Sequence, residues 1–294
     1  MKIVRSIEQM RAASRELRRG GKRLGFVPTM GALHAGHLAL VRAARSQADA
    51  VCVSIFVNPT QFGPKEDFSQ YPRPFEKDRE LLEAERVEVL FYPPVEEMYP
   101  PGATTWVEVA GMSERLDGKS RPGHFRGVTT VVSKLFHAVE PDLAFFGQKD
   151  GAQAAIIRRM ARDLDLDVRI VVCPTVREPD GLALSSRNVY LSAEERKRAT
   201  VLSRALRRIQ FHADKGEHRA AELLRIAKDV MAEEPEVRLD YFEIVDCDTL
   251  EPVADVASGA LVAVAAFVGS TRLIDNIVLF GAGNARGPAG SDKQ

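Results

Sequence analysis

Short apolar runs alternate with helical patterns over the first part of this 294-residue chain. The runs are rich in Val, Ile and Phe, which is typical of strands covered on both faces. They occupy residues 24–27, 50–57, 87–91, 143–146 and 168–173. Between them, apolar residues recur at helical spacing, as over 128–136. This alternation predicts an α/β fold with a doubly wound parallel sheet, which binds ligands outside the carboxyl ends of its strands.

The pattern changes near residues 174–180. Two helical stretches then precede three extended runs, an order that predicts a smaller α+β domain with an antiparallel sheet. The helical stretches are 193–213 and 219–233, and the extended runs are 237–245, 260–268 and 272–279. We therefore expect a first domain over 1–175 and a second over 176–282. The tail, 283–294, has no apolar face and is predicted to be disordered.

Charge and composition exclude several classes of protein. Lys and Arg number 41, as do Asp and Glu, so the net charge of zero argues against a general nucleic-acid binder. No run approaches the roughly 20 apolar residues of a membrane span, and the N-terminus lacks the apolar core of a secretory signal. Three scattered cysteines fit neither a disulfide framework nor a zinc site. We expect a cytoplasmic protein without nucleic-acid or membrane partners, in which Cys52 and Cys173 are buried.

Two histidines, His34 and His37, stand where the run 24–27 passes into a helix. A helix N-terminus presents free backbone N–H groups and the positive end of the helix dipole, which suits a phosphate. Gly36, between the histidines, lets a flat ligand approach the backbone closely. Each imidazole can donate a hydrogen bond and so stabilise charge that grows on phosphorus. The coincidence of these features favours a functional site over a pair of ordinary histidines.

Two further segments have both a functional and an ordinary interpretation. Lys149 and Asp150 follow the run 143–146, so they can neutralise a phosphate and accept from a ribose hydroxyl. A turn with an N-cap aspartate explains the same residues equally well. Ser185, Ser186 and Arg187 combine hydroxyls with a guanidinium, which suits a phosphate clamp. A capped loop before a helix is the alternative.

Polar residues after the run 50–57 indicate a pocket for a small polar substrate. Asn58 and Gln61 can hydrogen-bond such a substrate, Phe62 supplies an apolar wall, and Gln153 can face the same cavity. Asn58 precedes a proline, so it is also a credible turn former. The basic loop 121–127 is expected either to close over the site or to cap a helix.

Metal ligands are sparse in the sequence. No cluster of His, Cys and acidic residues has the spacing of a metal site. A magnesium ion that is carried on nucleotide phosphates needs only one or two carboxylates from the protein, and Asp78 is a candidate.

Taken together and in this order, the motifs resemble those of the pantoate–β-alanine ligase (pantothenate synthetase) family. The matching segments are 28–37, 54–62, 71–73, 121–128, 146–150 and 184–188, and the resemblance extends over residues 1–282. The histidine pair alone would indicate only the wider HIGH-motif nucleotidylyltransferase superfamily. The resemblance implies a Rossmann-like first domain and a homodimer.

The resemblance also implies an activity: the ATP-dependent ligation of pantoate and β-alanine to pantothenate, a precursor of coenzyme A. The reaction passes through a pantoyl adenylate and releases AMP and pyrophosphate, with Mg²⁺ accompanying ATP. The implied catalytic residues are His34, His37, Lys149 and Arg187, with His37 described as either a proton donor or a phosphate ligand.

The resemblance assigns substrates to further residues. The implied ATP-binding residues are Met30, Gly31, Ala32, Leu33, His34, Ala35, Gly36, His37, Gly147, Gln148, Lys149, Asp150, Val176, Leu184, Ser185, Ser186 and Arg187. Gln61 and Gln153 are implied to hold pantoate, with Gln61 also near the path of β-alanine. Since an acyl adenylate hydrolyses readily, we expect the second domain to close over the nucleotide and exclude water.

Two departures from the family pattern are visible. Leu184 stands where methionine is more common, an apolar exchange of similar volume that should be tolerated. Gly151 and Ala152 replace bulkier residues at the start of a helix. Two other interpretations remain open: a transferase that stops after nucleotidyl transfer, and a non-catalytic nucleotide sensor or RNA-binding module. A pocket that contains Asn58, Gln61 and Gln153 would favour the ligase.

Overall fold

The computed structural model describes residues 1–64, 66 and 68–279, so the predicted tail lies outside the described residues. The chain divides into two compact units, Met1–Tyr190 and Leu191–Gln294. The sequence predicts a domain boundary after residue 175, whereas the compact units meet after residue 190. The intervening segment, which includes Arg187, therefore groups with the first unit.

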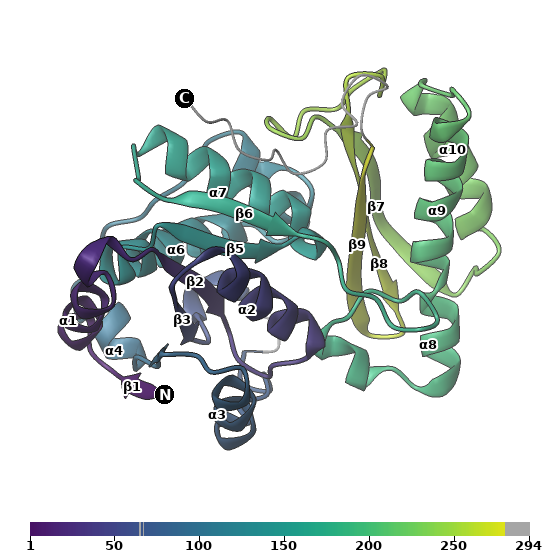
Figure 1. Ribbon diagram of the computed structural model, residues 1–294. Coiled ribbons are helices and arrows are strands. Elements are labelled where there is room, and N and C mark those ends of the chain that lie inside the picture. The colour runs from purple at the N-terminus through teal and green to yellow at the C-terminus, as the bar shows by residue number, and fades with distance from the viewer. Residues whose placement is uncertain (65, 67, 280–294) are drawn as a thin grey trace. The chain divides into compact units, whose positions relative to one another are not determined.

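The first unit is built on a six-stranded parallel sheet in the order β1-β4-β3-β2-β5-β6 (Figure 1). The strands are β1 (Lys2–Val4), β2 (Leu24–Thr29), β3 (Ala50–Ile55), β4 (Val89–Phe91), β5 (Leu143–Gly147) and β6 (Arg169–Cys173). The chain proceeds from β2 toward one edge and from β5 toward the other. The sheet therefore has its topological switch point between β2 and β5, where ligands of such sheets bind. The predicted doubly wound parallel sheet is confirmed.

Burial explains why the apolar runs form the centre of this sheet. Every residue of β3 is buried, as are the first four residues of β2 and of β5. The strand β1 was not predicted, because it has three residues of which only Val4 is buried. The strand β3 ends at Ile55, two residues before the end of the apolar run, where the chain turns into Asn58 and Pro59.

Helices cover both faces of the sheet because the crossovers after β2 and β5 run in opposite directions along it. The helix α2 packs against β2 and β5, and α6 and α7 pack against each other (Figure 1). The longer helices are α1 (Ile7–Leu17), α2 (Ala35–Gln47), α3 (Phe75–Ala84), α6 (His124–Val139) and α7 (Gly151–Asp163). The short ones are η1 (Arg19–Gly21), η2 (Pro59–Gln61), α4 (Val95–Met98), η3 (Met112–Glu114), α5 (Asp117–Ser120), η4 (Gln148–Asp150) and η5 (Ser186–Tyr190).

The second unit is a three-stranded antiparallel sheet with two long helices packed on it (Figure 1). Its elements are α8 (Ala193–Ala199), α9 (Val201–Asp214), α10 (Ala220–Met231), β7 (Val237–Val245), β8 (Ala260–Val268) and β9 (Thr271–Leu279). The predicted α+β composition is confirmed. The stretch 193–213, predicted as one helix, is instead divided at Thr200.

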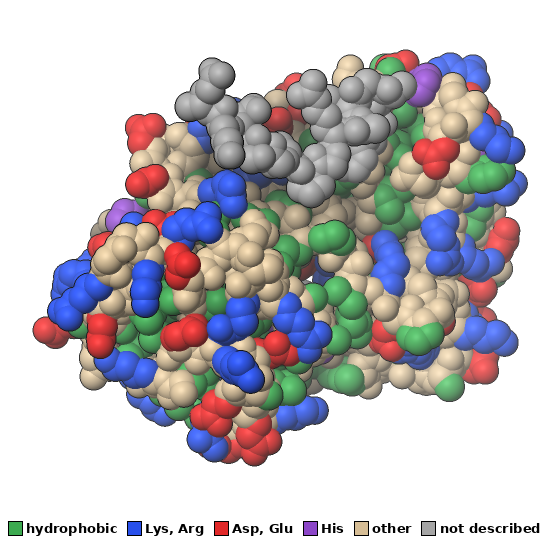
Figure 2. Space-filling view, in the orientation of Figure 1, with side chains coloured by type: hydrophobic (Ala, Val, Ile, Leu, Met, Phe, Trp, Pro, Cys, Tyr) green, Lys and Arg blue, Asp and Glu red, His purple; other side chains and the backbone are tan. Residues whose placement is uncertain are grey.

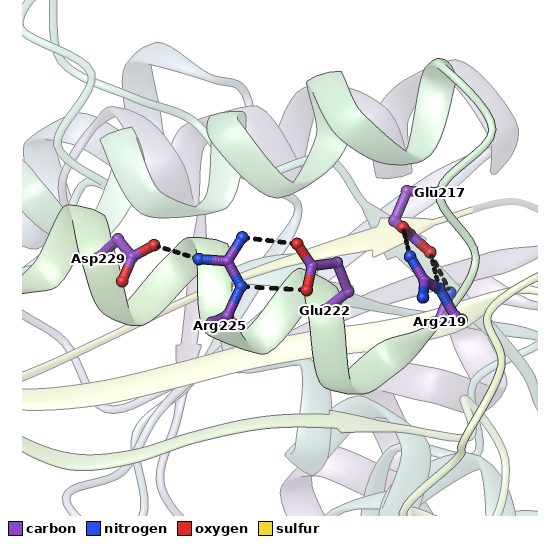
Figure 3. A network of polar contacts seen from close by, with 5 residues as sticks. All are labelled: Glu217, Arg219, Glu222, Arg225 and Asp229. Carbon is purple, nitrogen blue, oxygen red and sulfur yellow. Dashed lines mark hydrogen bonds and ion pairs between the residues drawn. The ribbon is translucent and has the colours of Figure 1, made fainter.

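Charges of both signs are mixed over the surface that Figure 2 shows, in keeping with a net charge of zero. One group of charged side chains at the surface, the α10 ladder, consists of Glu217, Arg219, Glu222, Arg225 and Asp229 (Figure 3). Within it, Arg225 bridges Glu222 at 2.6 Å and Asp229 at 2.8 Å. Among the described residues, no helix combines the length and apolar character needed to cross a membrane.

Candidate active site

The two histidines of the β2–α2 connection form a reciprocal cap at the start of α2. His34 is the N-cap residue, and its Nδ1 accepts the backbone N–H of Gly36 at 3.2 Å. The backbone N–H of His34 in turn donates to Nδ1 of His37 at 3.3 Å. The rings lie with centroids 4.1 Å apart. The sequence therefore places the imidazoles side by side through backbone hydrogen bonds of the first helical turn.

This capping determines which ring nitrogen carries the proton. A nitrogen that accepts a hydrogen bond holds no hydrogen, so in the neutral rings the proton is assigned to Nε2. Burial, and then the charge of Lys149, lowers the pKa of His34. Burial, and then the neighbouring His34, lowers the pKa of His37 to about 3. Both side chains are therefore neutral at pH 7, and each has one Nε2–H group to donate.

The glycine between the histidines makes room for a protein side chain. A Cβ at position 36 would lie 2.9 Å from Cε1 of His34, closer than real Cβ atoms come to a ring. The sequence interpretation, that Gly36 admits a ligand, overlooked this intramolecular contact. Its Cβ position also lies 3.9 Å from Cβ of Leu184, which brings the segment around Leu184 next to the histidines.

Asp78, on α3, holds the loop that precedes the histidines. Its two carboxylate oxygens accept the backbone N–H groups of Ala32 and Leu33, each at 2.8 Å, and its side chain is almost completely buried. Gly31 and Ala32 have φ angles of 82° and 51°, in the left-handed region. Such a conformation in a non-glycine residue is costly and persists only when its surroundings hold it. A cavity of about 250 Å³ opens beside Met30 and Gly31, with Asp78 in its wall.

This geometry changes the interpretation of Asp78. Both oxygens that were expected to bind a metal are engaged with the backbone instead. Burial raises the pKa of the carboxyl, although the two N–H donors oppose the shift. No group of three or more His, Cys, Asp or Glu side chains in the described part of the chain has a geometry that could hold a metal ion.

Lys149 and Asp150 lie at the carboxyl end of β5, across the switch point from the histidines. Asp150 is the N-cap residue of α7, yet its side chain makes no capping hydrogen bond there. It instead pairs with Lys149 at 3.2 Å. Burial favours the neutral acid, but the charge and hydrogen bond of Lys149, together with the charge of Arg187, outweigh it and lower the pKa of Asp150. The ordinary interpretation of Asp150 as a helix cap is therefore not supported.

The segment after β6 folds back as a narrow hairpin. The backbone N–H of Leu184 donates to the carbonyl of Val176 at 3.0 Å, so these two residues lie side by side. Ser185 Oγ accepts the N–H of Arg187 at 3.2 Å, which fixes the turn into η5. The hairpin, the histidines and Asp150 all belong to the first unit. Leu184 and Arg187 therefore belong to the same unit as the histidines.

Gln61, the last residue of η2, contacts Met30 at the start of the histidine loop. Its Nε2 approaches Sδ of Met30 at 3.0 Å, and its Oε1 accepts from Nδ2 of Asn58 at 3.1 Å. Asn58 is buried and uses its whole side-chain amide on protein groups. Its Nδ2 also donates to the Gly127 carbonyl, and its Oδ1 accepts from Thr60 and Tyr99. Asn58, expected to bind substrate, has no donor left for one and instead orients Gln61.

The backbone of Gln61 is held by the loop 121–127. The Gln61 carbonyl lies 2.8 Å from Nδ1 of His124 and 3.3 Å from Nη2 of Arg121. Arg121 makes a two-pronged ion pair with Glu66, with distances of 2.7 and 2.6 Å. Burial, and then the charge of Arg121, lowers the pKa of His124 to about 4. Sequence reasoning left this loop with an open role, and it missed Glu66.

The structure thus brings together some predicted residues and leaves others apart. The histidines, Lys149, Asp150 and Arg187 share one electrostatic environment. Gln61 joins the same loop through Met30. Gln153, in the first turn of α7, is partly buried, and its amide makes no hydrogen bond within the described residues.

The chain matches known proteins over nearly its whole length. A family model described as pantoate-beta-alanine ligase matches residues 2–278. A pantothenate synthetase of Koribacter versatilis is 60% identical over 98% of this chain and 99% of the relative. The structure of pantothenate synthetase from Thermus thermophilus superposes with a TM-score of 0.89, at 50% identity, over 94% of this chain and 99% of that one.

A second solved structure adds bound ligands to the comparison. The pantoate-beta-alanine ligase of Francisella tularensis was solved in complex with beta-gamma ATP and beta-alanine. It superposes with a TM-score of 0.78 at 35% identity, covering 95% of this chain and 97% of that one.

Proposed function

The chain belongs to the pantoate–β-alanine ligase family, and from this premise we propose how its site joins pantoate to β-alanine at the expense of ATP. A carboxylate is a poor acyl donor, because its leaving group would be oxide. Attack of the pantoate carboxylate on the α-phosphorus of ATP expels pyrophosphate and gives pantoyl adenylate. The amine of β-alanine then attacks the acyl carbon, which releases AMP and gives pantothenate.

The neutral, backbone-capped histidine pair is the observation that carries this proposal. With each Nδ1 occupied by a backbone N–H, both Nε2–H groups are fixed donors toward the phosphates of ATP. Donors that are already oriented stabilise the charge that develops at phosphorus without reorganising. Lys149 and Arg187 supply positive charge to the same polyphosphate.

His37 acts in this scheme as a hydrogen-bond donor. A pKa of about 3 leaves almost no imidazolium at pH 7. A bound polyphosphate would raise that pKa, because a nearby negative charge favours the protonated ring. Proton donation by His37 therefore depends on the nucleotide being present, whereas hydrogen bonding does not.

Gln61 and Gln153 form the pantoate end of the site in this proposal. The approach of Gln61 to Met30 supports this, because Met30 begins the loop that would hold ATP. The carboxylate of pantoate would then face the α-phosphorus, and the two amides would bind its hydroxyl and carboxylate oxygens. We propose the same ATP-binding roles for Gly147, Gln148, Val176 and Leu184 that the resemblance implies.

Magnesium enters as part of the substrate MgATP. Mg²⁺ commonly keeps its waters and binds through substrate phosphates with one or two carboxylates. The described residues fit such a phosphate-borne ion better than a protein cage, since Asp78 is engaged with the backbone. Asp150, which pairs with Lys149 at 3.2 Å, is an acidic side chain beside the groups proposed to bind phosphate.

Two wider properties remain part of the proposal. The family resemblance supports a homodimer, which sedimentation equilibrium of the purified protein would measure. It also supports a location in the cytoplasm, which fractionation of the source cells would test.

An AMP-release assay that omits each component in turn tests the function. We expect AMP only when ATP, magnesium, pantoate and β-alanine are all present, and oxygen-18 from the pantoate carboxylate should appear in AMP. AMP without ¹⁸O would exclude the adenylate. Nucleotidyl transfer without any effect of β-alanine would favour a transferase, and a complete lack of turnover would favour a nucleotide sensor.

A further inference from the structure

The loop 121–127 has no role in the proposed reaction, yet two of its side chains, those of Arg121 and His124, hydrogen-bond the backbone carbonyl of Gln61. We propose that Glu66, Arg121 and His124 form a positioning unit that fixes Gln61 and thereby sets the affinity for pantoate. This inference rests on the proposed function, in which Gln61 holds pantoate. None of the three side chains is assigned a contact with the reacting atoms.

The hydrogen-bond chain through this unit has one consistent direction. Arginine can only donate, so Nη1 of Arg121, 3.1 Å from Nε2 of His124, requires that nitrogen to accept. The proton of the neutral ring is therefore on Nδ1, which donates to the Gln61 carbonyl at 2.8 Å. This tautomer is the reverse of the one that capping imposes on His34 and His37.

The carboxylate of Glu66 holds the other end of the chain. Its two oxygens accept hydrogen bonds from Nε and Nη2 of Arg121. The side chains of Glu66 and Arg121 are only 27% and 18% exposed. A paired, two-pronged geometry of this kind defines the plane of the guanidinium. Burial would raise the pKa of Glu66, but the hydrogen bond and charge of Arg121 hold it below its usual value.

The opposite side of Gln61 is fixed by backbone packing. A Cβ on Gly127 would lie 2.4 Å from the carbonyl oxygen of Thr60 and 2.7 Å from the backbone nitrogen of Gln61. Only glycine therefore lets α6 approach the η2 turn this closely. The Gly127 carbonyl also accepts from Asn58, which orients the Gln61 side chain.

These contacts leave one group of Gln61 for a ligand. Its carbonyl is bound by His124 and Arg121, and its Oε1 is bound by Asn58. The Nε2 amide, beside Met30, therefore faces the site as a donor, which suits a carboxylate or hydroxyl oxygen of a hydroxy acid. Displacement of this donor should weaken the binding of pantoate much more than the binding of ATP. The loop that is proposed to bind ATP is held separately, because Asp78 binds the N–H groups of Ala32 and Leu33.

The test compares His124→Ala with His124→Asn. Alanine removes the donor, whereas the asparagine amide nitrogen takes nearly the position of Nδ1 and can still donate to the Gln61 carbonyl. We expect His124→Ala to raise the KM for pantoate by about 10- to 50-fold, with the KM for ATP within about threefold of wild type. His124→Asn should recover most of that loss.

A matched control comes from the same loop. Arg126 is exposed and its guanidinium lies over the Trp106 ring, 5.0 Å from the ring centroid. Arg126→Ala should leave both KM values unchanged, so any general effect of altering this loop would be detected. If His124→Ala proves unfolded by circular dichroism, Glu66→Gln replaces it, with an increase in the pantoate KM expected in the same direction.

Several outcomes would overturn the inference. A pantoate KM within twofold of wild type in folded His124→Ala would do so. Equal increases in both KM values, or no recovery in His124→Asn, would reduce the unit to a structural role. Failure of the proposed function would look different, because the wild-type protein would then release no pantoate-dependent AMP.

Discussion

The active-site loops and the α10 ladder both contain dense polar contacts, but the contacts differ in kind. Around Gln61 and the histidine pair, side chains bind backbone groups, as Asp78 binds two N–H groups of one loop. On α10, Arg225 instead pairs with two acidic side chains at the surface, Glu222 and Asp229 (Figure 3).

The difference determines what each group can do. An exposed ion pair gains little free energy, since water and salt replace it when it opens. A buried side chain that satisfies backbone N–H groups leaves them without partners when it is removed. Exposed ion pairs therefore contribute little to the conformation of the chain. Side chains that bind backbone N–H groups fix the path of a loop and the direction of its hydrogen-bond donors.

The largest expected effect is on the histidine pair. His37→Ala should reduce kcat by about 10²- to 10³-fold, because it removes one oriented donor to the phosphates. It should change the urea midpoint much less than it changes turnover. Steady-state kinetics of the purified variant measure the loss. A folded variant with near-normal turnover would refute the role of His37.

The next effect tests the loop support directly. Asp78→Asn should lower the free energy of unfolding by about 1–3 kcal/mol. The amide NH₂ that replaces one carboxylate oxygen cannot accept a hydrogen bond, so the N–H of either Ala32 or Leu33 loses its partner. The displaced loop should also raise the KM for ATP by about tenfold. Urea unfolding and ATP titration check both parts. A wild-type KM for ATP would show that Asp78 does not position the loop.

The pH dependence of stability separates the two regions. Burial lowers the pKa of His37 to about 3 and of His124 to about 4, so the unfolded chain binds protons first as the pH falls below about 6.5. The stability due to these neutral rings is complete above pH 6.5 and decreases as the pH falls toward their folded pKa values. Hydrogen bonds from Arg219 lower the pKa of Glu217, in the ladder, to about 2, so its contribution decreases only below about pH 4.5.

Urea midpoints at pH 7 and pH 5 measure this contrast. The wild-type protein should lose stability between these values, and the double variant His37→Asn, His124→Asn should lose less. Glu217→Gln should lose as much as wild type over this range. An equal loss in the histidine variant would mean that the imidazoles of His37 and His124 do not govern this titration.

The smallest effect is expected in the ladder itself. Arg225→Ala removes two ion pairs that are exposed on the surface of α10. It should leave turnover unchanged and the urea midpoint within experimental error. A clear fall in the midpoint would contradict the distinction between the two kinds of network.

The sequence alone was sufficient to predict the central strands, because these strands are buried along most of their length. The runs that became β2, β3 and β5 are apolar throughout, so local pattern and tertiary position agree. The β1 strand is short and mostly exposed, and its pairing with β4 depends on distant residues. Thr200 likewise remains helical in its angles, so nothing local predicts the division there.

The residues of the candidate site likewise differ in how far the sequence could predict their roles. The arrangement of the histidine pair depends on local contacts, since Nδ1 of each ring accepts a backbone N–H group from the first turn of the same helix. The roles of Asp78 and His124 depend on groups 46 and 63 residues away along the chain, so spacing could not identify them. The sequence shows the Asp78 carboxylate but not the N–H groups of Ala32 and Leu33 that it binds, so it could not indicate that role.

The central claim is that the backbone turns both Nε2–H groups toward the phosphates of ATP. A crystal structure of the protein with a non-hydrolysable ATP analogue tests it most directly. We expect Nε2 of His34 and of His37 within about 3.2 Å of phosphate oxygens, with both Nδ1 atoms still accepting backbone N–H groups. Phosphates bound away from the two rings, or rings turned so that Nδ1 faces the nucleotide, would contradict the account.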